Sequence, residues 1–481
     1  MIYNSFNFLV LFPLIFLLYY IIPAKYQKGR NMYLLAVSYI LYVSWKAAFA
    51  LVLLAVTLIT YWGGLILTVN GEGLKVKDAA RRKRLAFIFS LLGLLPLLVF
   101  KYYNFLNESI IEGLAIVGLH LALPGLNWAV PVGISFFTFQ AVGYMLDVYY
   151  GRIKAEREFL DYALFISFFP SILSGPINKA SLVLPQIKNL RTYFDYDKAV
   201  EGLKMILWGM FMKVVVADRV GLYVDTVLPS YMNYTGVTCF AASIFYTIQI
   251  YADFAGYSLM AIGVGKVLGF ELTENFRRPY FAISITDFWH RWHISLSTWL
   301  KDYVYIPLGG SHCSKLRNYW NIFVTFLVSG IWHGANWTFI VWGCMHGVCQ
   351  IFEKALGIQK LKSDNGFVKL TRVLITFLLV NFAWIFFRMP TLGDACGVIG
   401  RIFDFSLPMT LDVGSRHIFV LMMMGTVLLF LKDVTDEYIP TRFRLFENRY
   451  RVVRWMAYVM VIILIMLTGV FDAGQFIYAN F

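Results

Sequence analysis

The sequence predicts an all-α protein that crosses a membrane many times, and three observations favour this fold class. Hydrophobic residues make up 59% of the 481 residues, and the mean hydropathy is +0.66. Charged residues make up 15%, whereas a soluble domain carries about a quarter. Apolar runs long enough to cross a hydrocarbon core recur along the chain. Because backbone polar groups in lipid need internal partners, helices are the expected elements.

Nine clear apolar runs follow one another, and each is expected to form a membrane helix. They cover residues 5–22, 47–69, 85–100, 200–217, 318–332, 335–353, 369–388, 417–431 and 453–471. Shorter or more mixed runs lie near residues 31–46, 127–148, 160–174 and 236–270. We therefore expect a polytopic protein with roughly 10–13 transmembrane and re-entrant helices, some of them broken.

Basic residues predict how the chain lies in the membrane. Lys and Arg are frequent in residues 24–30, 75–84 and 442–454, and such segments collect on the cytoplasmic side. The first apolar run has no basic residue before it and no cleavage site after it, so we expect a retained helix. The N-terminus and the C-terminus are then both expected to be extracytoplasmic.

The net charge of +14 has two interpretations. Cytoplasmic loops collect Lys and Arg, and an anionic substrate or acidic carrier would also favour basic residues. Because the basic residues are spread over loops between apolar runs, nucleic acid is not an expected partner.

We treat residues 1–481 as a single membrane domain, because no linker or charged tail divides them. Residues 1–126 alternate apolar runs with short loops, and residues 354–481 are ordinary spans. Residues 127–353 concentrate Gly, Pro, Trp, His and Asp within or beside apolar runs. Polar residues at membrane depth are costly and usually functional, so we expect the catalytic core in this middle zone.

His333 is the first candidate catalytic residue, in the stretch SGIWHGANW. Gly330 and Gly334 stand four residues apart, which leaves one helix face open to another helix or a substrate. A buried imidazole tends to be neutral and then accepts a proton from a hydroxyl or thiol. The alternative is a histidine that only hydrogen-bonds a neighbouring helix, which is also the interpretation we give His346.

The stretch FWHRWHISLS at residues 288–297 leaves three interpretations open. Three-residue spacing would place His290 and His293 on one helical face, but further ligands at suitable spacing are missing, so we expect no metal site. An interfacial helix would explain the tryptophans and the arginine. In the third interpretation, His293 joins His333 in one reaction site.

Motifs typical of two other enzyme classes are missing from the sequence. The sequence has no GxxxxGK[ST] loop and no GxSxG elbow, so it predicts neither a P-loop ATPase nor a hydrolase of that type. A transporter or flippase with histidine proton relays is the alternative class. It needs acidic residues buried at mid-depth, for which Asp147 and Asp253 are the candidates.

The ordered set of motifs resembles the membrane-bound O-acyltransferase (MBOAT) family. FWHRWHISLSTWLKDYVYIPLGG and SGIWHGANWTFIVWG carry the resemblance, with similar blocks at residues 132–151, 168–177, 251–270 and 382–395. The pattern is similar above all to the bacterial branch that includes the membrane component of alginate O-acetylation. The resemblance covers nearly the whole chain from residue 130 onward.

The resemblance implies a ring of helices around a tunnel, which the donor thioester enters from the cytoplasm and the acceptor from outside. It implies that His333 is the essential catalytic residue, as general base or acyl relay. His293 would position the thioester carbonyl or stabilise developing charge, and some family members carry Asn at this position. Further substrate-binding candidates are Tyr251, Asp253, Trp289, Arg291, Trp292, Ser295, Trp332 and Asn336. Candidates for holding donor phosphates are Arg277, Arg278, Arg291 and Lys301.

The implied function is membrane O-acetyltransfer from a cytoplasmic thioester, acetyl-CoA above all, without a tightly bound cofactor. The acceptor would be alginate, cellulose, another exopolysaccharide or peptidoglycan, outside a bacterial cytoplasmic (inner) membrane whose lipid surrounds the chain. The chain has no serine-esterase domain, so the resemblance implies an extracytoplasmic serine-esterase-like partner, with residues 476–481 as a candidate contact. D-alanyl or other acyl transfer to a cell-envelope polymer, lipid or protein is the alternative.

Three departures from the family pattern stand out. His290 replaces a usual Arg, Leu259 replaces a common Asp, and Ala479 and Asn480 alter the last residues. We expect the first two to affect substrate preference and to leave the general mechanism intact.

Overall fold

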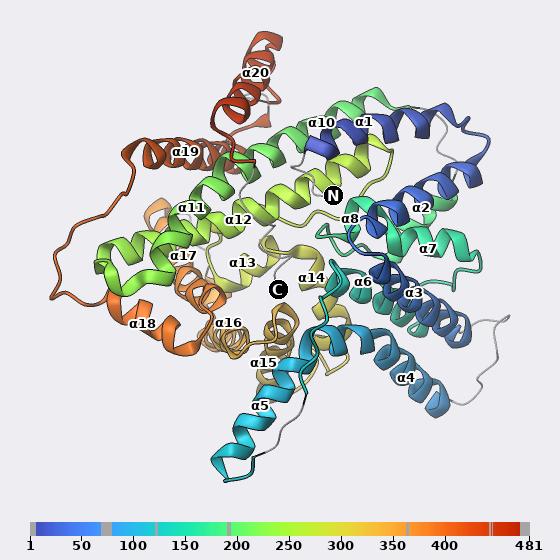
Figure 1. The fold of residues 1–481 in the computed structure, drawn as a ribbon, viewed down its shortest axis with the longest axis horizontal. Coiled ribbons are helices and arrows are strands. Elements are labelled where there is room, and N and C mark those ends of the chain that lie inside the picture. The colour runs from blue at the N-terminus through green and yellow to red at the C-terminus, as the bar shows by residue number, and fades with distance from the viewer. Residues whose placement is uncertain are drawn as a thin grey trace. The chain divides into compact units, whose positions relative to one another are not determined.

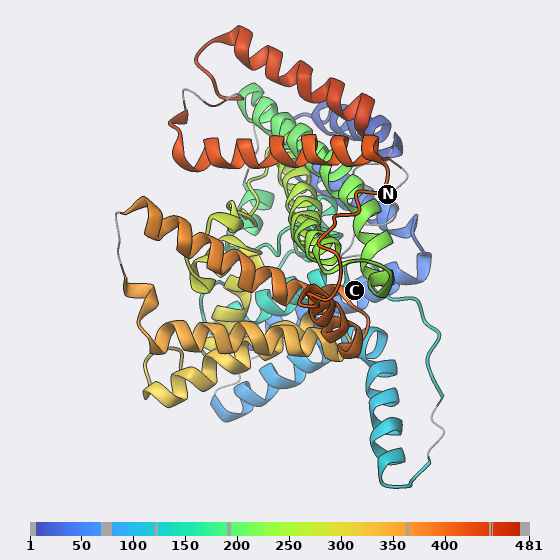
Figure 2. The same ribbon diagram turned by 90° about the vertical axis from the view of Figure 1, so that its left-hand side faces the viewer.

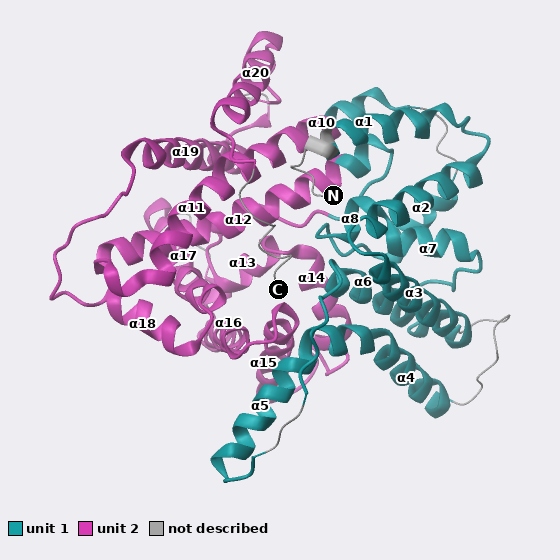
Figure 3. Cartoon of the chain, in the orientation of Figure 1, with its two compact units in different colours: residues 1–201, 264–273 teal, residues 202–263, 274–481 magenta. Residues whose placement is uncertain are grey.

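The computed structural model describes residues 6–68, 79–120, 124–189, 194–361, 365–441, 444 and 446–471, and every regular element in these ranges is a helix (Figure 1). This confirms the predicted all-α fold class. The chain forms two compact units (Figure 3). Unit 1 comprises residues 1–201 and 264–273, and unit 2 comprises residues 202–263 and 274–481.

Unit 1 is built around α3, α4 and α6, which pack against one another. Its helices are α1 (Phe6–Ile21), α2 (Gln27–Val43), α3 (Ala47–Leu67), α4 (Ala79–Leu97), the π-helix η1 (Leu98–Tyr102), α5 (Tyr103–Ile116), α6 (Ile134–Tyr149), α7 (Phe159–Ser167), α8 (Phe169–Ile172) and α9 (Ala180–Lys188). The 21 residues of α3 span about 31 Å, which matches a hydrocarbon core of about 30 Å. The buried Thr57 and Thr60 hydroxyls bond to carbonyl oxygens one turn earlier, and the Thr60 hydroxyl also lies 2.7 Å from the Tyr162 hydroxyl on α7.

Unit 2 holds most of the helices that follow. They are η2, a π-helix (Phe211–Ala217), α11 (Asp218–Val227), η3 (Leu228–Asn233), η4 (Pro279–Phe281), α13 (Ile285–Arg291), α14 (Ile294–Leu300), the π-helix η5 (Lys301–Tyr305), α15 (Lys315–His333), α16 (Trp337–Ala355), η6 (Ile358–Lys360), α17 (Gly366–Arg388), α18 (Leu392–Ile402), α19 (Arg416–Tyr438) and α20 (Arg451–Thr468). Helices α10 (Tyr196–Met210) and α12 (Gly236–Val267) contribute residues to both units. Figure 2 shows α15, α16 and α17 running side by side, and α16 packs against both neighbours.

Six helical stretches among the described residues are long and apolar enough to cross a membrane. They are Ala47–Leu67, Ala79–Ile116, Gly236–Val267, Gly366–Arg388, Arg416–Tyr438 and Arg451–Thr468. These stretches support a multi-pass membrane protein. The other apolar runs form helices that fall short of this length or apolarity, so the count of 10–13 stays a prediction.

Broken helices occur in the middle of the chain, as the sequence predicts. Helix α7 stops at Ser167 and is followed by the four-residue α8. Helices α13 and α14 have seven residues each and are separated by Trp292 and His293. Whether any of these helices is re-entrant, and on which side each loop lies, stays a prediction. Both chain ends, including residues 476–481, lie outside the described residues.

A buried lysine ties η2 to two helices of unit 2. The Lys213 ammonium lies 2.7 Å from a carboxylate oxygen of Asp218 on α11 and 2.7 Å from one of Asp253 on α12. The Lys213 side chain is only 2% exposed. Charges this deeply buried require close opposite charges, because their separation from water is costly.

Candidate active site

The candidate active site lies within unit 2, and His293 lies in it at a break between the two short helices α13 and α14. Helix α13 begins after Ser284, whose hydroxyl accepts the backbone N–H of Asp287 at 3.0 Å. It ends at Arg291, because Trp292 is extended and His293 is left-handed, with φ 43° and ψ 53°. The break turns His293 inward, and its side chain is 0% exposed.

His333 is the last residue of α15, and two glycines fix the position of that helix. A Cβ on Gly330 would collide with the carbonyl oxygen of Phe339, and one on Gly343 would collide with the carbonyl oxygen of Phe326. Helices α15 and α16 therefore approach through backbone atoms at Gly330, which is one of the two predicted alternatives, whereas Gly334 lies just after the end of α15. His333 is 2% exposed.

The two histidines face the same aromatic cluster. Their ring centroids lie 6.5 Å apart, and the Trp332 ring lies 5.8 Å from His293 and 4.9 Å from His333. Trp342 on α16 lies 4.9 Å from His333, and Phe387 on α17 lies 5.2 Å from it. The structure thus brings together the two predicted catalytic residues and one predicted substrate-binding residue, Trp332.

Burial sets the charge of His293. This residue lies outside the six apolar stretches, and burial lowers the pKa of its ring to about 3. The ring is therefore neutral at neutral pH and retains one nitrogen lone pair. Phe254 on α12 packs edge-on against it, with a centroid distance of 4.7 Å.

Asn275 holds His293 from the loop that precedes η4. Its Oδ1 lies 3.1 Å from His293 Nδ1, and it accepts the Ser295 hydroxyl at 2.9 Å and the Ser295 backbone N–H at 3.3 Å. The predicted Ser295 thus reaches the site through Asn275. Asn275 itself was not predicted, because it stands 18 residues before His293 (293 − 275) and no local spacing connects them.

The two tryptophans of the FWHRWH stretch, Trp289 and Trp292, pack against further aromatic residues. The Trp289 indole donates to His346 Nδ1 at 3.3 Å and packs 5.7 Å from Trp342. Trp292 stacks on Phe288. His346 is buried and hydrogen-bonded, as its structural interpretation predicts.

Three predicted substrate-binding residues use their polar groups elsewhere. Asn336 caps α16 by accepting the Thr338 backbone N–H at 3.0 Å. The Tyr251 hydroxyl donates to Asp433 at 2.9 Å, and Asp253 pairs with Lys213. Their role in substrate binding stays a prediction, although each has an evident structural partner.

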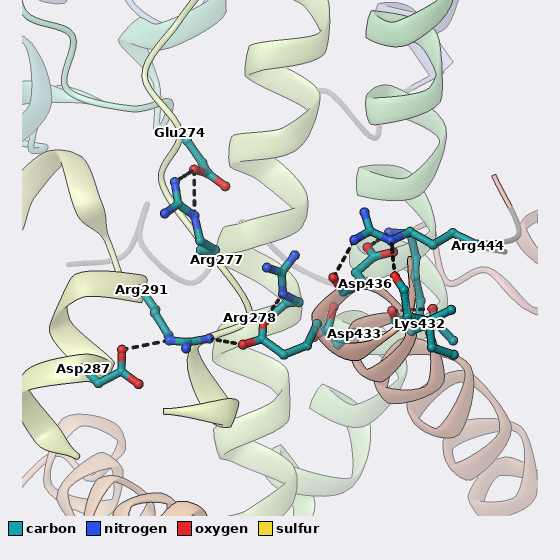
Figure 4. Close-up of polar contacts among 12 residues, drawn as sticks. Glu274, Arg277, Arg278, Asp287, Arg291, Lys432, Asp433, Asp436 and Arg444 are labelled. Carbon is teal, nitrogen blue, oxygen red and sulfur yellow. Dashed lines mark hydrogen bonds and ion pairs between the residues drawn. The ribbon is translucent and has the colours of Figure 1, made fainter. Parts of the chain in front are cut away.

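The predicted phosphate-binding arginines are paired with carboxylates (Figure 4). Arg291 lies 3.0 Å from Asp287 and 2.9 Å from Glu437, and Arg278 lies 2.5 Å from Glu437. Arg277 pairs with the glutamate three residues before it. Because these pairs already neutralise the arginines, they are weaker candidates for donor phosphates than the sequence suggests.

A cavity of about 250 Å³ lies among α13, α14, α15 and α16. Its lining includes Trp289, His290, Lys301, Ser329 and Lys354. The Ser329 hydroxyl is buried and has no hydrogen-bond partner among the described residues. Ser329 precedes His333 by one helical turn, so the cavity approaches the histidine pair along α15.

The metal-site alternative for His290 and His293 is wrong in its geometry. It requires both histidines on one helical face, but α13 ends at Arg291 before the second histidine. His290 is exposed and lines the cavity, whereas His293 is buried beside Asn275. Within the described ranges, no cluster of three or more His, Cys, Asp or Glu side chains is placed to hold a metal ion.

Comparisons with known proteins identify the family of this chain. A model of the membrane-bound O-acyltransferase family matches residues 151–390, which include both histidines. The probable alginate O-acetylase AlgI of Pseudomonas syringae pv. tomato is 40% identical over 408 residues, covering 84% of this chain and 76% of that protein.

The chain belongs to the membrane-bound O-acyltransferase family.

Two further relatives show the range of acyl groups within the MBOAT family. The peptidoglycan O-acetyltransferase of Helicobacter pylori is 35% identical over 80% of this chain and 76% of that protein. The teichoic acid D-alanyltransferase of Bacillus subtilis is 30% identical over 53% of this chain and 68% of that protein. This MBOAT chain is therefore a multi-pass membrane acyltransferase.

Proposed function

We propose that this MBOAT protein is an O-acetyltransferase of the bacterial inner membrane. It takes an acetyl group from a cytoplasmic thioester, acetyl-CoA, and supplies it for O-acetylation of an extracytoplasmic polysaccharide. The observation that carries the proposal is the convergence of His293 and His333, with ring centroids 6.5 Å apart, in one buried aromatic site. The relatives named as alginate and peptidoglycan O-acetylating proteins support acetyl as the group transferred.

His333 is the general base of the proposed reaction. Its ring takes the proton of the attacking hydroxyl while the hydroxyl oxygen bonds to the acyl carbon. The carbon–sulfur bond then breaks, and the same proton passes to the leaving thiolate, so the transfer is neutral overall. General acid–base catalysis of this kind contributes about 10²–10⁴-fold to a rate. The surrounding rings limit the access of water to the thioester, so hydrolysis is slow but still measurable as turnover when no acceptor is present.

The cavity beside α15 is the proposed binding place of the donor. Lys301 and Lys354 line it and offer positive charge to the phosphates of the donor. Trp289 supplies an apolar wall, and the buried Ser329 hydroxyl is available to an amide of the donor arm. Lys301 is one of the phosphate-binding candidates predicted from the sequence, and Lys354 joins it here in place of the paired arginines.

The proposal also includes an acceptor and a partner protein outside the membrane. The relatives act on alginate or peptidoglycan by name, and an exopolysaccharide or peptidoglycan is the proposed acceptor. A serine-esterase-like protein outside the membrane receives the acetyl group and delivers it. D-alanyl transfer is the second candidate, which the Bacillus subtilis relative supports over a smaller part of the chain.

Thioester turnover by the purified protein tests the proposal. Radiolabelled acetyl-CoA is supplied to wild type, His333→Ala and His293→Ala in nanodiscs, and thioester loss and label transfer are followed. We expect turnover by wild type and a loss of at least about 100-fold in His333→Ala. His312→Ala is the matched control, because His312 is an exposed histidine of the same unit.

Equal turnover by all four proteins would contradict the catalytic role of His333. Turnover of a D-alanyl thioester in place of acetyl-CoA would favour the second candidate. Acetylation of a polysaccharide by the purified chain alone would remove the need for the partner protein.

A further inference from the structure

Asn275 is the buried centre of a hydrogen-bond network in unit 2. It is 0% exposed, and its Nδ2 donates to the hydroxyl of Ser258 on α12 at 3.0 Å. Its Oδ1 faces Ser295 and His293, and its backbone carbonyl accepts the N–H of Ile294 at 2.9 Å. The one residue thus contacts α12, the break before α14 and the first turn of α14.

The orientation of the Asn275 amide follows from its neighbours. The backbone N–H of Ser295 can only donate, so the Asn275 atom that faces it at 3.3 Å must be the oxygen. The nitrogen then faces the Ser258 hydroxyl oxygen, which accepts. The reversed amide would place its NH₂ group against the Ser295 backbone N–H and leave that donor without an acceptor.

The tautomer of His293 follows in turn. An amide oxygen only accepts, so the His293 Nδ1 that lies 3.1 Å from it must carry the proton. In the neutral ring, Nε2 then holds the lone pair. His346 shows the opposite case, because its Nδ1 faces the Trp289 indole N–H, which only donates. The site therefore contains two buried histidines with opposite tautomers.

We propose that Asn275 is a positioning residue that fixes His293 as a hydrogen-bond acceptor in acyl transfer. Through Nε2, His293 accepts an N–H or O–H group of a bound substrate and orients it beside His333. A neutral His293 in this tautomer has no ring N–H on Nε2 to donate to the thioester carbonyl, so the proposed role differs from the carbonyl-positioning or charge-stabilising role that the family resemblance implies. The inference rests on the proposed acyl transfer and specifies that His293 accepts, rather than donates, a hydrogen bond in it.

The pH profile of Asn275→Asp tests this role. The new carboxylate still accepts from Nδ1, but its charge favours the doubly protonated ring, which has lost the Nε2 lone pair. An opposite charge at this distance raises a histidine pKa by about 1–3 units. We expect the acid limb of kcat/KM to move up by at least about one pH unit, with activity recovering at higher pH.

Asn381→Asp is the matched control for the added charge. Asn381 is also 0% exposed in unit 2, and its side chain bonds to Ser243 and Thr247. We expect no shift of the acid limb in this variant. A uniform loss of activity at all pH values in Asn275→Asp, or an equal shift in Asn381→Asp, would show that Asn275 has only a structural role.

A direct measurement separates this inference from the proposed function. In wild-type protein labelled with ¹⁵N-histidine, the His293 signals, identified by their absence in His293→Asn, should show a protonated Nδ1. A protonated Nε2 would overturn the inference even if acetyl-CoA is turned over. Absence of any acyl transfer by wild type, with the predicted tautomer present, would instead count against the proposed function. This spectrum also decides the matter if Asn275→Asp does not fold.

Discussion

At the scale of single residues, His293 stands in a backbone conformation that few side chains accept. Its φ of 43° places it in the left-handed region, which costs an L-residue roughly 1–2 kcal/mol. Histidine and asparagine occur there several-fold more often than other side chains, and β-branched residues are outliers. The Asn275 bonds to Nδ1 and to the following turn hold this conformation in place.

This backbone predicts how substitutions of His293 differ in stability. His293→Val should unfold at a free energy about 1–2 kcal/mol below that of His293→Asn, because valine tolerates the left-handed region poorly. Thermal unfolding in detergent measures the difference. At His312, where φ is not positive, the same pair of substitutions should differ by less than about 0.5 kcal/mol. Equal stability of the two His293 variants would mean that the loop adjusts its backbone freely.

The residues of the site were predicted to different extents. His333 could be identified because a histidine between long apolar segments is rare, and His293 because its motif resembles the family. The indirect contributors, Asn275, Trp342 and Phe387, could not be identified. Asparagines and aromatic residues are common throughout this chain, and only the tertiary contacts show which of them meet the histidines.

At the scale of elements, the position of His333 depends on how closely α15 and α16 approach. Gly330 and Gly343 face each other's helix without side chains between them. Both helices have 19 residues, so this contact fixes two long elements through a short stretch of backbone. Any side chain added there must push the helices apart, since backbone atoms cannot change rotamer.

Gly343→Ala is therefore expected to reduce both stability and activity. The methyl group would collide with the Phe326 carbonyl oxygen, and overpacking of this kind costs about 1–3 kcal/mol. Activity should fall further than unfolding alone explains, because His333 moves relative to Trp342. Gly400→Ala on α18 is the control, as nothing lies within 4 Å of its added Cβ. Acetyl-CoA turnover and thermal unfolding of both variants check the prediction, which fails if they behave alike.

Helix boundaries were predictable where apolar runs are long. The run 318–332 became α15 (Lys315–His333), and the run 335–353 became α16 (Trp337–Ala355). The break at Trp292 was not predictable, since the three-residue spacing of the histidines suggests a continuous helix. The left-handed turn depends on Asn275, which is brought there by the tertiary fold.

At the scale of the whole molecule, the sequence predicted a helical membrane protein but not its division into two units. Residues 264–273 belong to unit 1 although residues on both sides of them belong to unit 2. Periodicity describes how a segment folds along its own axis. Periodicity carries no information on which distant segments a helix will contact. The apolar runs therefore could not predict that residues 264–273 belong to unit 1.

The Lys213 ion pairs give a stability prediction at this scale, because they join η2, α11 and α12. Lys213→Met leaves two buried carboxylates without their cation and should lower the free energy of unfolding by about 3–5 kcal/mol. Adding Asp253→Asn should restore part of the loss, since one buried charge is removed. Lys315→Met, at an exposed lysine, should change stability by less than about 0.5 kcal/mol. A thermal unfolding series in detergent would refute this if Lys213→Met matched Lys315→Met.

The same ion pairs impose an order on biosynthesis. The ribosome completes Lys213 and Asp218 well before Asp253, which stands 40 residues after the lysine (253 − 213). Until α12 has been translated, Lys213 can pair with Asp218 alone, and its second ion pair, with Asp253, is missing. The segment containing η2 therefore cannot reach its final burial during its own synthesis. Translation of α12 supplies the missing partner, so chains stalled before residue 253 would lack the ion pair that joins η2 to α12.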